Sequence, residues 1–253
     1  MGSKARIAKK IAPILNSVIE KYQIDTYIEP FVGGANIIEH IECKHKYGID
    51  INSYLIYFWK AIQSGWNPFS FEMTRESYEK IRDNKDDYPP EVVALAGLCA
   101  TYNAKWFGGY AGIVNTKIGT QRNYYDEAVR NVLAQREKIL DVKFSCRDYK
   151  TITKAEGALI YCDPPYQNTT GYKDDFNHDE FWDWIKLVSK NNYVFVSEYS
   201  APNEFQCIFQ SELTTTLDKS SRSQSTEKMF IHNNWVFNQL LKPILDEKYG
   251  ATA

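Results

Sequence analysis

The chain has 253 residues, of which 43% are hydrophobic and 25% are charged, and its net charge is −2 at pH 7. These values are typical of a globular protein with one large domain, or one domain that carries an insertion. No apolar run approaches a membrane span and the N-terminal residues lack a signal-peptide core, so we expect a cytoplasmic protein without a membrane partner. The five cysteines and four histidines lack the spacing of a metal site, so we expect reduced thiols and no metal.

The positive charge is concentrated in one part of the chain. Residues 101–154 contain ten Lys or Arg and five Asp or Glu, so this segment carries +5 and the remainder carries −7. A surface that binds phosphate groups requires such an asymmetry. A solvated helical face with compensating ion pairs explains it equally well, and both interpretations stay open.

The N-terminal part predicts helices and strands in alternation. Apolar residues at helical spacing predict an amphipathic helix over residues 5–22, with a kink or restart at Pro13. The other elements expected here are a strand at 26–31, a helix at 37–41, a strand at 47–50 and a helix at 51–62.

Two glycines and one acidic residue lie at the ends of these predicted strands. Gly33 and Gly34 follow the first strand, where the missing side chains let the backbone approach a ligand. Asp50 ends the next strand, where an acid can accept hydrogen bonds from both hydroxyls of a ribose. It could equally cap the helix that follows. The segment is neither GxGxxG nor a P-loop, so a nucleoside-containing cofactor is favoured over a nicotinamide or an NTP.

Residues 63–135 lack an obvious alternation of strand and helix, and they contain Pro89-Pro90 and a glycine-rich aromatic patch at 103–110. We expect an inserted, mainly helical subdomain with a substantial loop. The remaining predicted elements are strands at 142–146, 158–162 and 193–197 and a polar loop at 220–226. The predicted domains are therefore a catalytic domain formed by 1–62 and 136–253, and an insertion formed by 63–135.

The sequence Asp163-Pro164-Pro165-Tyr166 ends the apolar strand at 158–162. Each proline fixes its own φ and lacks an N–H, which predicts a stiff turn that presents a carboxylate beside an aromatic ring. In open α/β sheets ligands bind at this end of the strands. The pair suits a planar partner that carries an amino group, such as a nucleobase. The alternative is an ordinary turn in which Tyr166 only packs.

The segments Glu29 to Gly34, Asp50 to Asn52 and Asp163 to Tyr166, in that order, resemble the Dam-type (alpha group) adenine-N6 DNA methyltransferases. The resemblance implies a class I fold that binds S-adenosyl-L-methionine (AdoMet). This fold is α/β and Rossmann-like, with a mixed, mostly parallel sheet and helices on both faces. It also implies that the insertion recognises double-stranded DNA and that an adenine is flipped out of the duplex.

Further segments carry the resemblance. Gly2 to Lys4 is similar to the family's N-terminal cofactor motif, Phe144 to Tyr149 to its adenine-contacting segment, and Glu227 to Ile231 to its closing strand. The cofactor-binding residues that the resemblance implies are Lys4, Glu29, Pro30, Phe31, Gly33, Gly34, Asp50, Asp148, Tyr149 and Asp163.

The resemblance also assigns catalytic roles to Asp163, Pro164, Pro165 and Tyr166. The Asp163 carboxylate and the Pro164 carbonyl would hold the hydrogens of the adenine amine, and Tyr166 would stack on the base. Residues 172–176 would form a loop that closes over the flipped base, or a surface loop whose aromatic side chains dock on the domain.

Candidate DNA contacts are Lys105, Lys117, Gln121, Arg122, Asn123 and Arg222. Their side chains are of the types that read base edges, although the same types are common on plain surfaces. We therefore transfer no recognition sequence to this chain.

Other functions stay open from sequence alone. The acceptor could be cytosine N4, RNA or a protein glutamine, or the chain could be a DNA-binding or AdoMet-sensing module without catalysis. Aspartate at the first position of the Asp163 motif resembles the adenine enzymes, and the intact motif favours catalysis. A restriction partner, a phage origin or a solitary role are all compatible with the sequence, as are a monomer and a weak dimer.

Overall fold

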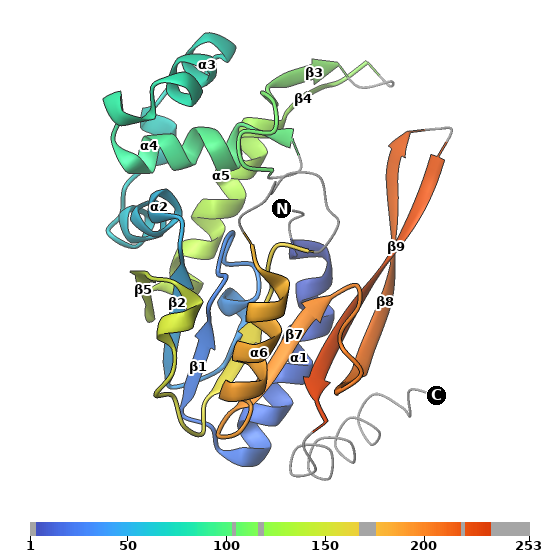
Figure 1. Ribbon diagram of the computed structural model, residues 1–253. Coiled ribbons are helices and arrows are strands. Elements are labelled where there is room, and N and C mark those ends of the chain that lie inside the picture. The colour runs from blue at the N-terminus through green and yellow to red at the C-terminus, as the bar shows by residue number, and fades with distance from the viewer. Residues whose placement is uncertain (1–3, 103–104, 116–118, 167–175, 219–220, 234–253) are drawn as a thin grey trace. The chain divides into compact units, whose positions relative to one another are not determined.

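The computed structural model describes residues 4–102, 105–115, 119–166, 176–218 and 221–233 (Figure 1). The helices are α1 (Ala5–Tyr22), α2 (Ser53–Gln63), α3 (Arg75–Asp83), α4 (Pro90–Ala94), α5 (Tyr124–Gln135) and α6 (His178–Val188). The strands are β1 (Thr26–Glu29), β2 (His45–Asp50), β3 (Ile113–Asn115), β4 (Gln121–Asn123), β5 (Val142–Cys146), β6 (Leu159–Cys162), β7 (Tyr193–Glu198), β8 (Phe205–Asp218) and β9 (Ser221–His232).

Seven strands form one sheet in the order β5-β2-β1-β6-β7-β9-β8, and β3 pairs with β4. β2–β5, β1–β6 and β6–β7 are parallel, whereas β9 runs antiparallel to β7 and β8. The predicted α/β fold with a mixed, mostly parallel sheet is therefore confirmed. No helix among the described residues is both long enough and apolar enough to cross a bilayer.

The chain divides into two compact units. The first comprises Met1–Ala12, Val32–Ile41 and Lys46–Arg147, and the second comprises Pro13–Phe31, Glu42–His45 and Asp148–Ala253. The predicted boundaries of the insertion, at residues 63 and 135, stay a prediction.

The first unit contains β2 and β5, helices α2 to α5 and the β3–β4 hairpin. Gly48 in β2 lies opposite Phe144 in β5, and a Cβ at Gly48 would come within 2.7 Å of the Phe144 ring. The glycine therefore lets a large buried ring pack against the strand. Between residues 63 and 135 the described elements are mainly helical, as expected, and the hairpin is the one pair of strands described there.

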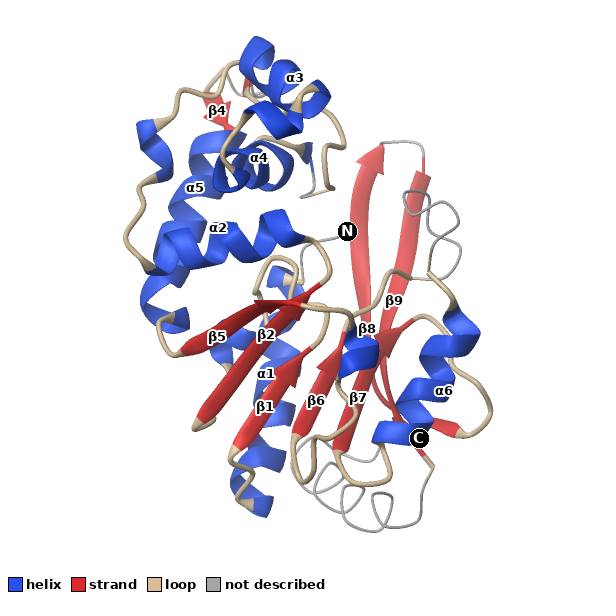
Figure 2. Cartoon of the chain, turned by 60° about the vertical axis from the view of Figure 1, so that its left-hand side comes forward, coloured by secondary structure: helices blue, strands red, loops and turns tan. Residues whose placement is uncertain are grey.

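The second unit contains β1, β6 and β7 side by side, followed by β9 and β8 (Figure 2). All four residues of β6 are buried, which fits the apolar run from Leu159 to Cys162. Helix α6 begins at the Asn177 cap, whose side chain accepts from the Glu180 N–H. It buries Phe181, Ile185 and Val188 at helical spacing.

Two predicted elements are wrong. Residues 37–41 form only a short 3-10 turn, Ile38–His40, and the chain is extended again at Ile41 (φ −89°, ψ 129°). The buried Ile37, Ile38 and Ile41 are β-branched residues fixed by packing, and their spacing imitates a helix.

The predicted polar loop at 220–226 is also wrong from Ser221 onward, because β9 begins there and pairs with β8 from Asp218 back to Phe205. The backbone hydrogen bonds of a two-stranded ribbon form without apolar side chains. A prediction based on polar composition therefore took this segment for a loop.

Candidate functional site

The glycine turn after β1 is tied to the end of β2 within the first unit. The Gly33 N–H donates to Asp50 Oδ2 at 2.9 Å, and the Asn52 N–H donates to Asp50 Oδ1 at 2.9 Å. Gly33 has φ 45°, a left-handed conformation that favours glycine. The Trp59 indole N–H donates to the Gly33 carbonyl at 2.8 Å, which fixes the turn from α2.

Asp50 is not the cap of the following helix. That role belongs to Asn52, whose side chain accepts from the Tyr54 N–H at 3.1 Å. Burial raises the pKa of the Asp50 carboxyl, while hydrogen bonds from the N–H groups of Asn52, Gly33 and Ile51 act in the opposite direction. The side chain of Ile51, directly after this carboxylate, is 72% exposed. The Asp50 carboxylate, a hydrogen-bond acceptor, is thus followed by the exposed apolar side chain of Ile51. The sequence analysis did not name Ile51 as a candidate site residue.

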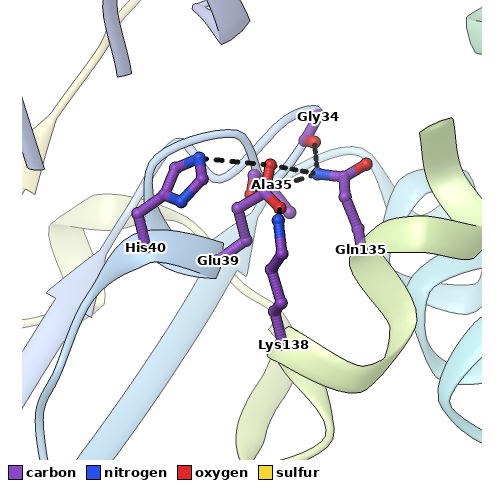
Figure 3. Close-up of polar contacts among 6 residues, drawn as sticks. All are labelled: Gly34, Ala35, Glu39, His40, Gln135 and Lys138. Atoms are coloured by element: carbon purple, nitrogen blue, oxygen red, sulfur yellow. Dashed lines mark hydrogen bonds and ion pairs between the residues drawn. The ribbon is translucent and has the colours of Figure 1, made fainter. Parts of the chain in front are cut away.

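The end of α5 also contacts the glycine turn (Figure 3). The Gln135 Nε2 donates to the carbonyls of Gly34 at 3.2 Å and Ala35 at 3.4 Å, and to Glu39 Oε1 at 3.3 Å. The Lys138 ammonium lies 2.8 Å from Glu39 Oε2. These partners are about a hundred residues apart in sequence, so no local pattern could have identified Gln135.

In the second unit, two residues with predicted cofactor contacts lie together. The ring of Phe31 packs against that of Tyr149, with centroids 5.2 Å apart, and Phe176 and Phe181 extend the cluster. Burial, with smaller contributions from the charges of Glu180 and Asp148, raises the pKa of Tyr149 to about 12. Tyr149 is therefore a neutral packing residue.

Acidic side chains at these segments are already engaged. Glu29 is buried and accepts a hydrogen bond of 3.0 Å from the Tyr27 hydroxyl. Asp148 Oδ1 accepts from the Lys150 N–H at 2.9 Å and caps a short 3-10 turn. Pro30 and Lys4 are buried, and Gly2 and Ser3 lie outside the described residues.

The Asp163 to Tyr166 turn follows β6 directly. Pro164 is buried, and Asp163, Pro165 and Tyr166 are half-buried. The Tyr166 hydroxyl donates to Glu227 Oε2 at 2.7 Å. Burial is the main reason that the pKa of Tyr166 lies well above its usual value, and the charges of Asp163 and Glu227 raise it further. The phenol is therefore a hydrogen-bond donor, and Glu227 holds the hydroxyl end of its ring.

Two of the candidate DNA-binding residues, Arg122 and Asn123, bond to other residues of the protein. Arg122 in β4 donates to both oxygens of Glu127, at 2.8 Å and 2.7 Å, and lies over the Tyr124 ring at 4.5 Å. Asn123 caps α5 by accepting from the Asp126 N–H.

Lys105 and Gln121 are exposed. Lys117 and residues 172–175 lie outside the described residues, and for Arg222 only the backbone, in β9, is described. Within the described ranges no group of three or more His, Cys, Asp or Glu side chains could hold a metal ion.

Comparison with known proteins gives consistent matches. The family model "D12 class N6 adenine-specific DNA methyltransferase" matches residues 1–235. The chain is 25% identical over 215 residues to type II methyltransferase M.FokI of Planomicrobium okeanokoites, covering 74% of this chain and 31% of that protein. It is 26% identical over 217 residues to M.MjaIII of Methanocaldococcus jannaschii, and the match covers 71% of this chain and 74% of that protein.

A third relative is the DNA N-6-adenine-methyltransferase of Escherichia phage P1, which is 29% identical over 208 residues. The match covers 70% of this chain and 27% of the phage protein. The chain thus spans less than a third of the M.FokI and phage P1 proteins.

Proposed function

This chain belongs to the D12 class N6 adenine-specific DNA methyltransferases, and we propose that it methylates adenine N6 at specific sites in double-stranded DNA. The observation that carries the proposal is the Asp163 to Tyr166 turn. It presents a half-buried carboxylate at the end of a fully buried strand, beside a ring that Glu227 anchors. A bacterial or phage-infected cytoplasm is the setting we propose for it.

Asp163 and Pro164 would activate the acceptor. The exocyclic amine of adenine is a poor nucleophile because its lone pair is delocalised into the ring. Two acceptors, the Asp163 carboxylate and the Pro164 carbonyl, would hold its two hydrogens and favour a pyramidal nitrogen. The carboxylate would also stabilise the positive charge that develops on this nitrogen, and the proton can leave after the methyl arrives.

Tyr166 would hold the base. The target must leave the duplex to reach these groups, and stacking on the Tyr166 ring would offset part of the cost of unstacking. Because the hydroxyl of Tyr166 is bonded to Glu227, the ring is held before the base arrives. Such preorganisation lowers the entropy lost on binding.

The residues around Asp50 fit a nucleoside cofactor. The Asp50 carboxylate accepts the N–H groups of Gly33 and Asn52, and a carboxylate with about four lone-pair sites can also accept a ribose hydroxyl. The exposed Ile51 offers an apolar contact for a flat ring. We propose that Gly33, Gly34, Asp50 and Ile51, all of which lie in the first unit, hold AdoMet. When bound, AdoMet supplies an electrophilic methyl group on a sulfonium.

The test is methyl transfer to unmethylated plasmid DNA from tritiated AdoMet, with the modified nucleoside identified by mass spectrometry. We expect N6-methyladenine from the wild-type chain and loss of at least about a thousandfold in kcat from Asp163→Ala. Asp183→Ala is the matched control, because Asp183 is 78% exposed on α6 and forms only a 3.6 Å surface pair with Lys186.

Different results identify different errors. N4-methylcytosine as the product would show that the acceptor is misassigned. Binding of S-adenosylhomocysteine without any methyl transfer would indicate a silent module. Methylome sequencing of cells that express the chain would then define the recognition sequence.

A further inference from the structure

The hydroxyl of Tyr166 reaches a carboxylate 61 residues further along the chain. Glu227 lies in β9, opposite Ser211 of β8, and is only 9% exposed. Burying a carboxylate is unfavourable unless its oxygens accept hydrogen bonds. The 2.7 Å bond from Tyr166 is one such bond, so the two side chains stabilise each other in this arrangement.

The sheet explains how β9 reaches the turn. β6 pairs with β7 through Cys162 and Val196, and β7 pairs with β9 through Glu198 and Lys228. The residue after Cys162 is Asp163, and Glu227 precedes Lys228, so Glu227 lies within β9 at the level where β6 and β7 end.

A second ring restrains Tyr166 from β7. The ring of Tyr199, which follows the last residue of β7, meets the Tyr166 ring edge-on, with centroids 4.6 Å apart and planes at 81°. Glu227 thus fixes the end of the Tyr166 side chain while Tyr199 fixes the orientation of its ring.

We propose that Glu227 is a positioning residue for the methyl acceptor, acting through Tyr166. A base that stacks on Tyr166 takes its plane from that ring, and its amine must then meet the Asp163 carboxylate and the Pro164 carbonyl. A tilt of the ring misplaces the amine, and errors of about 1 Å in such alignments reduce rates by about a hundredfold. This inference rests on the proposed function, since it assumes a flat base as substrate.

The test is a double-mutant cycle with Tyr166→Phe and Glu227→Ala, using plasmid DNA and tritiated AdoMet. Each single change should lower kcat by about tenfold and leave the KM for AdoMet unchanged, because a hydrogen bond to a charged group is lost. The double variant should lose no more than the worse single variant, since both changes remove the same bond. Glu227→Gln should stay within about threefold of wild type, because an amide oxygen also accepts the hydroxyl.

The matched control is the cycle of Tyr161→Phe and Ser197→Ala. The Tyr161 hydroxyl and Ser197 Oγ also form a buried bond of 2.7 Å, between β6 and β7, but Tyr161 is not in the turn. These changes should lower the melting temperature and leave kcat within about twofold.

The outcomes separate the inference from its premise. If the wild-type chain methylates no DNA, the proposed function fails. If the wild-type chain is active and the two losses multiply in the double variant, or if kcat is unchanged in Tyr166→Phe, the positioning role of Glu227 is overturned. Should Glu227→Ala fail to fold, Tyr166→Phe still removes the bond from its other partner and decides the question.

Discussion

The Asp50 carboxylate supports the glycine turn and is also the proposed acceptor for the cofactor ribose. Burial raises its pKa above the ordinary 3.8, although three backbone N–H groups favour its ionised form. Since the pKa in the folded chain is the higher one, the stabilisation from Asp50 is fully present below the unfolded pKa and is lost as the pH rises through the folded pKa. At neutral pH its ionised form therefore costs stability, which hydrogen bonds from ligand hydroxyls would offset.

This state of Asp50 predicts a pH-dependent affinity for S-adenosylhomocysteine. Protonation removes an acceptor, so the affinity should fall as the pH is lowered from neutral, beginning above the pH at which an ordinary Asp titrates. Asp50→Asn should weaken binding by about tenfold and flatten this dependence, because one turn N–H then faces an amide NH2. Isothermal titration calorimetry at several pH values measures both effects.

Asp83→Asn is the control for this measurement, since Asp83 is an exposed α3 residue paired with Arg82. It should retain the wild-type affinity and pH dependence. Parallel pH profiles for wild type and Asp50→Asn would rule out Asp50 as the titrating group.

At the scale of elements, α5 acts as a support for the glycine turn. Its last residue, Gln135, donates to two carbonyls of the turn, and Lys138 just beyond it holds Glu39. Carbonyls that point into a turn repel each other, and the Gln135 amide compensates for this by bridging them. The conformation that presents the Gly33 N–H to Asp50 is therefore stabilised by a segment distant in sequence.

We expect Gln135→Ala to raise the KM for AdoMet about tenfold while leaving the Kd for DNA unchanged, because the turn loses its bridging donor. Steady-state kinetics and a DNA-binding assay separate the two quantities. Gln63→Ala is a close control: the Gln63 Nε2 also donates to two backbone carbonyls, those of Ile139 at 2.7 Å and Val142 at 2.8 Å. It should lower the melting temperature without changing the KM for AdoMet. Equal effects of both variants on that KM would indicate general destabilisation instead.

Sequence patterns predicted the elements whose signals are local. The helix at Ala5–Tyr22 and the strand at Val142–Cys146 have their predicted bounds, because periodicity and apolar runs are set by neighbouring residues, although the helix does not restart at Pro13. The Ile38–His40 turn and the start of β9 were mispredicted, because burial by distant elements and pairing with a partner strand decided them. Local patterns carry no information on either.

The candidate site follows the same rule. The order of motifs identified Asp50 and Asp163 from sequence, since Asp50 ends β2 and Asp163 directly follows β6. Gln135 and Glu227 were not predicted to support the site, because their partners lie about a hundred and 61 residues away. Gln135 belongs to no motif in the sequence and Glu227 only to the predicted closing strand, so only the folded sheet and helices bring them to the motifs they hold.

At the scale of the whole molecule, the charge count overstates the surface available to phosphates. The +5 of residues 101–154 includes several cations that are paired with acids. Arg122 is bonded to both oxygens of Glu127, and Arg130 and Lys138 lie near Asp126 and Glu39. The Arg122 guanidinium lowers the pKa of Glu127, so this pair stays ionised at neutral pH. An arginine held in this way must leave its partner before it can contact DNA.

Glu127→Gln should therefore tighten binding to plasmid DNA at low salt. The released Arg122 can add one phosphate contact, which would steepen the dependence of log Kd on log salt by up to about 0.9. Glu76→Gln changes the net charge by the same amount, from −2 to −1, but disrupts only the exposed pair with Lys80 on α3. It should leave the slope unchanged. Both variants alter the net charge equally. If the slope of log Kd against log salt changes equally in both, overall charge determines DNA affinity. If the slope changes only in Glu127→Gln, the β3–β4 hairpin contributes to DNA binding.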